Sequence, residues 1–241
     1  MRTNSNLSMV QSVVEGLGNL VNEVVFVGGA VLELYIEDPA IQKIRPTQDV
    51  DFVVELDTRT NYYKFEEKLR QKGFKNDIRK DAPICRWIFK DITVDAMPTD
   101  EKIIGFSNIW YSEGIRNPIW VTLPHTKDCS IALFSHPYFL ASKLEAFKAR
   151  GNKDYIGSPD LEDILTVLDG TIDFEKLRSG SQNVKTYLRN NFKKFLADPY
   201  FLEIISIHIE QGPGNAIRRE RIINMMQGVV NQKVPNDKFR R

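Results

Sequence analysis

The stretch VVFVGGAVLELYIEDPAIQKIRPTQDVDFVV, residues 24–54, decides the fold of this chain. An apolar run ends at Gly28 and Gly29, a helix-like segment follows, and TQDVD opens a second apolar run. Because strand side chains alternate between two faces, Asp49 and Asp51 are expected on the same face. Two such carboxylates repel each other unless a cation, typically a divalent metal, holds them. A Gly-Gly turn nearby presents backbone N–H groups to an anion, so the stretch predicts a metal beside a phosphate cradle.

The bulk composition is that of a soluble globular protein. The chain has 241 residues, enough for one large or two small domains, with 42% hydrophobic and 27% charged residues. No apolar stretch approaches the roughly 18 residues that span a bilayer, and the first residues lack the apolar core of a signal peptide. Cys85 and Cys129 have no CxxC spacing and are expected to be reduced thiols. We therefore expect a cytoplasmic protein with no membrane partner.

Charge is distributed unevenly along the chain. Residues 173–241 contain 13 Lys/Arg and 7 Asp/Glu, a balance of +6, whereas the whole chain carries +1. The first 172 residues therefore carry −5. An acidic front part suits metal binding, and a basic rear part suits a polyanionic partner such as RNA. Helices that are simply solvated by Lys and Arg remain the alternative explanation.

The first 135 residues or so, called the front part below, alternate between short strands and helices. The patterns predict helices at 8–20, 30–36 and 62–73, strands at 24–27 and 48–56, a hairpin of 86–90 with 92–97, and short strands within 119–135. This pattern predicts an α+β fold, with a small mixed sheet and flanking helices.

The part of the chain after about residue 135 is expected to be entirely helical. Helices are predicted at 138–150, 159–170, 173–197, 199–210 and about 216–227. Ser158 and Pro159 predict a side-chain cap and a first-turn proline, and the tail after Gly228 is polar and expected to fray. We therefore place a catalytic domain at 1–135 and a helical domain that completes the cleft at 136–241.

A third carboxylate is needed for two-metal phosphoryl transfer. Asp95, within the apolar alternation ITVDAM, supplies a candidate to join Asp49 and Asp51. A salt bridge or a water-exposed edge remains the structural explanation for Asp95. An EF-hand loop starting at Asp49 would need Gly and Glu where the chain has Val54 and Thr60, so a calcium loop of this kind is excluded. The GxGxxG dinucleotide fingerprint is missing as well.

Two basic residues in the first rear helix form a candidate anion site. Lys143 and Arg150 lie seven residues apart, hence on one side of the helix and roughly 10.5 Å apart. Such a pair can neutralise a triphosphate across a cleft. A snorkelling lysine and an arginine favoured by the helix dipole are the structural alternative.

The acidic residues that follow divide into two groups. Asp160 and Glu162 lie in the first turn of a predicted helix, where the helix dipole explains them. Asp154 and Asp163 are interpreted as partners that orient the two basic side chains.

The front motifs resemble those of the nucleotidyltransferase superfamily of DNA polymerase beta type. The resemblance rests on Gly28 and Gly29, then Asp49 and Asp51 in TQDVD, then the lone Asp95 on a later strand. It implies the nucleotidyltransferase fold.

The rear motifs are similar to the AbiEii/MenT-like branch of that superfamily. The similarity rests on YFLASKLEAF at 138–147, Arg-Gly at 150–151 and SPDLEDI at 158–164. It extends over residues 24–170. This branch is known for toxins of bacterial toxin–antitoxin and phage-defence systems.

The resemblance implies roles for the front residues. Gly28 and Gly29 would bind the triphosphate of an NTP substrate through their N–H groups. Asp49 and Asp51 would hold two Mg²⁺ ions, or Mn²⁺ in their place. Asp95 would complete the second metal site and help to deprotonate the attacking hydroxyl.

It also implies roles for residues around them. Lys143 would contact the phosphates, with Arg150 and Asp163 in the same site. Many members have Gly-Ser where this chain has two glycines, so a hydroxyl contact to phosphate is missing. Thr47 is interpreted as orienting the metal-binding strand.

The expected reaction is the transfer of an NMP from an NTP to a hydroxyl, with release of pyrophosphate. The resemblance points to RNA, at a tRNA 3′ end, as acceptor, in a toxin–antitoxin or defence setting with a cognate antitoxin protein. A protein or small-molecule acceptor is one alternative. A catalytically silent module that binds nucleotide or RNA is another.

Overall fold

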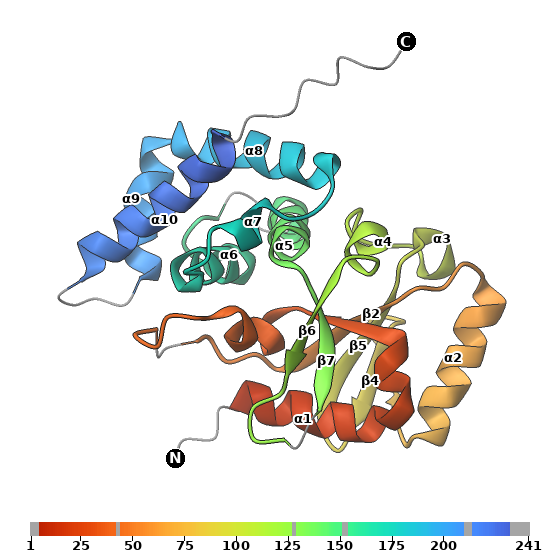
Figure 1. Cartoon of the computed structure of the whole chain (residues 1–241). Coiled ribbons are helices and arrows are strands. Elements are labelled where there is room, and N and C mark those ends of the chain that lie inside the picture. Colours follow the sequence, from red (N-terminus) through yellow and green to blue (C-terminus); the bar gives the residue numbers. More distant parts are fainter. Residues whose placement is uncertain (1–4, 42–43, 127–128, 151–153, 210–213, 232–241) are drawn as a thin grey trace, which may run out of the picture.

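A seven-stranded mixed sheet forms the centre of the front part (Figure 1). The computed structural model describes residues 5–41, 44–126, 129–150, 154–209 and 214–231. Its strand order is β3-β4-β5-β2-β1-β7-β6. The strands are β1 (Val24–Val27), β2 (Asp49–Val54), β3 (Lys75–Asn76), β4 (Arg86–Phe89), β5 (Ile92–Pro98), β6 (Pro118–Thr122) and β7 (Ser130–Phe134).

Both parallel and antiparallel pairs occur in this sheet. Strand β2 pairs antiparallel with β1 and parallel with β5, and β1 pairs parallel with β7. The predicted hairpin is confirmed as the antiparallel pair β4–β5, and β6–β7 forms a second antiparallel pair. The expected mixed sheet with flanking helices is therefore present.

Helices of the front part cover the sheet and its edges. They are α1 (Ser5–Leu17), η1 (Gly18–Glu23), η2 (Gly29–Tyr35), α2 (Arg59–Gln71), α3 (Glu101–Ile104) and α4 (Tyr111–Gly114). Helix α1 lies below the sheet in Figure 1 and buries Val10, Val13, Val14 and Leu17, which recur at helical spacing. The segment predicted as a helix at 30–36 is a 3₁₀ helix, the tighter form common in short connections.

The described residues after β7 are helical apart from their connections. The helices are α5 (His136–Arg150), α6 (Pro159–Gly170), α7 (Glu175–Arg178), α8 (Gln182–Leu196), α9 (Pro199–His208) and α10 (Asn215–Val230). As predicted, Ser158 caps α6 by accepting a hydrogen bond from the Leu161 N–H, and Pro159 occupies the first turn.

Two predicted helix boundaries in this part were wrong. The helix expected at 173–197 is divided into α7 and α8, because Gly180 adopts φ +88° and Ser181 caps the new helix. Helix α10 continues through Gly228 to Val230, and the glycine makes room for the ring of Phe174, with which a Cβ would collide, rather than ending the helix. The tail predicted to fray lies mostly outside the described residues.

A continuous hydrophobic core joins the sheet to the helices above it. The cluster includes Phe26 and Leu133 of the sheet together with Phe139 of α5 and Ile164 of α6. Helix α5 follows β7 after the single residue Ser135, so the chain passes directly from one part to the other. Among the described residues, no helix combines the length and apolar character needed to cross a membrane.

Candidate active site

Three carboxylates converge at the middle of the sheet. Asp51 of β2 lies directly opposite Asp95 of β5 in the parallel pair, so the two side chains share a face. Asp49 lies two residues earlier on the same strand and projects from the same face. One carboxylate oxygen from each residue lies within 4.8 Å of the others. Such a cluster of hard oxygen ligands fits Mg²⁺ or Mn²⁺.

The two glycines lie directly beside these carboxylates. Gly28 ends β1 with φ +80°, and a Cβ there would overlap the carboxylate of Asp51. At Gly29, a Cβ would approach Arg45 Nη2 to 3.0 Å. The absence of side chains therefore lets bare backbone lie between an acidic and a basic group.

Repulsion among the carboxylates changes the protonation of one of them. Burial, followed by the charges of Asp49 and Asp95, raises the pKa of Asp51 to about 8. Lys143 and Arg150 partly offset this rise. Without a metal ion, Asp51 is thus largely protonated at neutral pH, which lowers the repulsion within the triad of Asp49, Asp51 and Asp95.

Thr47 holds the outermost carboxylate in place. Its hydroxyl donates to Asp49 Oδ1 over 2.7 Å, and its backbone N–H donates to Asn6 Oδ1 over 3.1 Å. The amide of Asn6 in turn donates to the carbonyl of Arg45. Helix α1 therefore anchors the segment that leads into β2.

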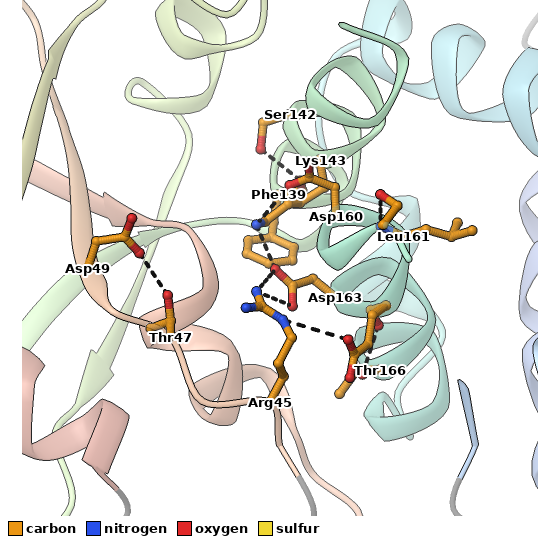
Figure 2. A network of polar contacts seen from close by, with 12 residues as sticks. Arg45, Thr47, Asp49, Phe139, Ser142, Lys143, Asp160, Leu161, Asp163 and Thr166 are labelled. Carbon is orange, nitrogen blue, oxygen red and sulfur yellow. Dashed lines mark hydrogen bonds and ion pairs between the residues drawn. The ribbon is translucent and has the colours of Figure 1, made fainter. Parts of the chain in front are cut away.

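Basic residues of the helical part line the other side of the site, and Figure 2 shows one of them, Lys143, across from Asp49. Lys143 and Arg150 both lie on α5, and both contact Asp160 of α6. Lys143 Nζ lies 3.2 Å from Asp160 Oδ1, while Arg150 Nε and Nη2 lie 2.8 and 2.9 Å from Asp160 Oδ2 and Oδ1. Asp160 is 1% exposed, so a buried anion fixes both cations.

Asp163, one turn further along α6, extends this network to the loop before β2. Its Oδ2 lies 2.6 Å from Lys143 Nζ, and its Oδ1 lies 3.2 Å from Arg45 Nη2. Burial opposes the charge of Lys143, but Asp163 and Asp160 raise its pKa above the ordinary value. Lys143 therefore stays positively charged although it is buried.

Two of the sequence interpretations of these acidic residues were wrong. Asp160 does more than complement the helix dipole, because it binds both cations of α5. Asp154 accepts hydrogen bonds from the N–H groups of Ile156 and Gly157 and so closes the turn before α6. Asp163 does contact Lys143, as predicted.

Two arginines of the site were missed. Arg45 lies in the segment before β2, where no periodic pattern marks its direction. Arg86 lies opposite Asp95 in the β4–β5 hairpin and donates two hydrogen bonds to it. The hairpin was predicted, so the pairing of Arg86 with Asp95 was available as a signal.

A cavity of about 630 Å³ separates the two walls. This is within the range of 300–1,000 Å³ typical of ligand pockets. Phe106, Asn108 and Tyr111 also line it. The glycine, polar and charged residues that line it include Gly28, Gly29, Arg45, Thr47, Asp49, Asp51, Arg86, Asp95, Lys143, Arg150 and Asp160.

Comparison with known proteins leaves the function to be argued from this cavity. No protein-family model matches the chain, and no curated protein matches it. The crystal structure of JHP933 from Helicobacter pylori is similar over 95% of this chain and 93% of that chain, with 13% sequence identity and a TM-score of 0.47. Similarity at this level carries no functional argument.

Proposed function

We propose that this protein is a Mg²⁺-dependent nucleotidyltransferase that moves an NMP from an NTP to a hydroxyl acceptor. The observation that carries the proposal is the pair of facing walls: three converging carboxylates on one side of the cavity, and on the other the buried Lys143 and the more exposed Arg150, both fixed by Asp160. A metal–triphosphate complex has the complementary arrangement of charge, with cations at one side and phosphate oxygens at the other.

The acidic wall holds the metal in this proposal. Asp49, Asp51 and Asp95 supply the ligands, and bound Mg²⁺ or Mn²⁺ would neutralise the triphosphate and lower the pKa of the acceptor hydroxyl. Thr47 keeps Asp49 oriented through its 2.7 Å hydrogen bond. The glycine at position 28 leaves room for the Asp51 carboxylate beside the backbone.

The opposite wall binds the phosphates. Lys143 and Arg150 are held toward the cavity by Asp160, and Arg45 adds a third positive charge beside Gly29. In the reaction, the acceptor hydroxyl gives up its proton, which Asp95 would help to remove, its oxygen forms a bond to the α-phosphorus, and the bond to pyrophosphate breaks. The negative charge on the departing pyrophosphate is stabilised by the cationic wall.

The type of fold and the division of the chain into two domains belong to the same proposal. We propose that the sheet part is a nucleotidyltransferase fold and that residues 136–241 complete its cleft as a helical domain. The supporting observation is that the cavity takes its carboxylates from the sheet and Lys143 and Arg150 from α5.

RNA is the acceptor that we favour. The support is the +6 balance of residues 173–241, since counterion release from a polyanion favours binding to a basic surface. The defence setting, with an antitoxin as partner, is part of this proposal. A gene for a small partner protein beside this one in the genome would support it.

The test is a transfer assay with each NTP labelled at the α-phosphate. The protein, Mg²⁺ and one NTP are incubated separately with total RNA, protein or metabolites. We expect label in the RNA and a loss of about 100-fold or more in the Asp49→Ala variant. The exposed Asp81 provides the matched control, Asp81→Ala, which should retain activity.

The fraction that carries the label separates the acceptors. If the label appears in protein or in metabolites rather than in RNA, the proposed acceptor is wrong but the proposed nucleotidyl transfer stands. An absence of transfer in every fraction, together with an absence of Mg–NTP binding, contradicts the proposed reaction.

A further inference from the structure

Arg86 engages both oxygens of one carboxylate in the triad. Arg86 Nε lies 2.8 Å from Asp95 Oδ1, and Arg86 Nη2 lies 2.7 Å from Asp95 Oδ2. This is the two-point pairing in which the planar guanidinium matches a carboxylate, and it is stronger than a single contact. Asp95 is therefore committed to an internal cation.

The sheet register explains why this arginine reaches the site. Arg86 is opposite Asp95 across β4–β5, and Asp95 is opposite Asp51 across β5–β2, so the three side chains form one row on one face. Arg86 Nη2 also lies 3.9 Å from Asp49 Oδ2. Among the ion pairs of the described residues, those of Arg86 are the ones that reach the triad.

The carboxylates are consequently unequal as metal ligands. A divalent ion between Asp49 and Asp51 leaves the pairing of Arg86 intact. An ion that also binds Asp95 must share the oxygens of this carboxylate with the guanidinium, and it brings two positive charges next to a third. This second ion is therefore disfavoured until another anion can receive Arg86.

We propose that Arg86 takes the place of the second divalent cation in the nucleotide-free protein, so that this ion enters together with the NTP. The inference rests on the proposed function, since it assigns the order in which that site is filled. The triphosphate supplies the negative charge that draws Arg86 away from Asp95. Arg86 is thus a positioning residue that prevents full metal loading before the nucleotide arrives.

The test counts Mn²⁺ ions bound to the nucleotide-free protein by titration followed by electron paramagnetic resonance. We expect one ion per wild-type chain at concentrations where a second binds at least about tenfold more weakly. In the Arg86→Gln variant, the second ion should bind about tenfold more tightly than in wild type. With a non-hydrolysable NTP analogue, both proteins should bind two ions.

A matched control removes an arginine elsewhere. Arg116 pairs with Glu55 and its side chain is 66% exposed, so Arg116→Gln should bind Mn²⁺ like wild type. Arg86→Lys keeps the charge but not the two-point contact, and an intermediate second affinity is expected. It carries the test if Arg86→Gln does not fold, which thermal unfolding in EDTA will show.

The outcomes separate this inference from the proposed function. Two ions of equal affinity in nucleotide-free wild type, or identical titrations of wild type and the Arg86 variants, overturn the inference alone. An absence of Mn²⁺ binding in wild type even with the NTP analogue overturns the proposed metal centre, and the inference with it.

Discussion

At Gly28 an added side chain and the carboxylate of Asp51 would occupy the same space. The Gly28→Ala substitution places a methyl group against Asp51 at a φ of +80°. We expect it to displace the carboxylate and to abolish Mg²⁺–NTP binding, in addition to a backbone cost of about 1–3 kcal/mol in unfolding free energy, because the ψ of −171° at Gly28 belongs to a region adopted essentially by glycine alone. Calorimetry with a non-hydrolysable NTP, and urea unfolding, measure the two effects.

Gly105 offers a control with a similarly positive φ and no neighbour, although its ψ is −2° and that of Gly28 is −171°. Its φ is +89°, and an added Cβ would meet nothing within 4 Å. Gly105→Ala should therefore lose about 1 kcal/mol of stability but keep nucleotide binding. If Gly28→Ala and Gly105→Ala bound the nucleotide equally well, the close approach of Gly28 to the Asp51 carboxylate would not matter for binding.

The protonation of Asp51 predicts how stability depends on pH in the absence of metal. Its pKa is about 8 in the folded protein, raised by burial and then by Asp49 and Asp95, against about 3.9 in an unfolded chain. Between these values the folded state keeps a proton that the unfolded state has lost. The contribution of Asp51 is full below about pH 4 and is lost as the pH rises through about 8.

This contribution can be isolated with the Asp51→Asn variant. The unfolding free energy of wild type relative to Asp51→Asn should fall between about pH 5 and about pH 8, by at most about 1.4 kcal/mol per pH unit. Urea unfolding of both proteins in EDTA measures it. Parallel pH profiles would contradict the raised pKa of Asp51.

At the scale of elements, α5 and α6 are joined by buried charges. Asp160 contacts Lys143 and Arg150, so Asp160→Asn leaves the buried Lys143 undercompensated and releases Arg150, whose side chain is 69% exposed. We expect a loss of about 3 kcal/mol in unfolding free energy, the lower end for a broken buried ion pair, because Asp163 still contacts Lys143. The KM for NTP should rise, since the two cations lose their common anchor.

Glu162, two residues further along α6, provides the control. Its side chain is 37% exposed and lies 3.8 Å from Arg45. Glu162→Gln should cost less than about 1 kcal/mol and leave the KM for NTP unchanged. Urea unfolding and initial-rate kinetics compare the two variants. Equal losses would show that the charge of α6 as a whole, and not Asp160, holds the cations.

Elements with strong local signals were predictable, whereas side-chain partners were less so. The 24–27 strand, the β4–β5 hairpin and the Ser158 cap follow from apolar runs and turn chemistry that act within a few residues. The break at Gly180 was missed because the apolar residues Leu177, Val184 and Leu188 keep helical spacing across it, although Ser-Gly is itself a turn signal.

The same limit applies to the candidate site. Alternation placed Asp49 and Asp51 on one face, and the register with β5 brings Asp95 beside them. Arg45 escaped notice because its partner, Asp163, lies on a helix more than 100 residues later. Contacts of this kind depend on tertiary packing, which local sequence patterns do not encode.

At the scale of the whole molecule, the +6 balance of residues 173–241 predicts how RNA binding depends on charge. Lys193 and Lys194 are exposed on α8. The double variant Lys193→Glu/Lys194→Glu should raise the KM for RNA about tenfold at low salt and reduce its salt dependence, because fewer counterions are released. The KM for NTP should not change. Transfer rates over a range of salt and RNA concentrations measure these effects.

A control makes the same change of charge on the sheet part. Lys64 and Lys80 are both exposed, so Lys64→Glu/Lys80→Glu alters the net charge equally. It should leave the KM for RNA near the wild-type value. Equal losses in the two double variants would show that net charge, and not the basic helical part, governs RNA binding.

The parallel pairing of β2 with β5 also links the metal site to the order of folding. Asp49 and Asp95 lie 46 positions apart, and α2, β3 and β4 come between them in the chain. A local hairpin cannot assemble these two ligands, so an ion held by both Asp49 and Asp95, as proposed for the second ion, would bind only after a non-local strand pair has closed. Because such an ion would favour the folded state by mass action, its binding rate during refolding would report the moment at which β2 and β5 pair.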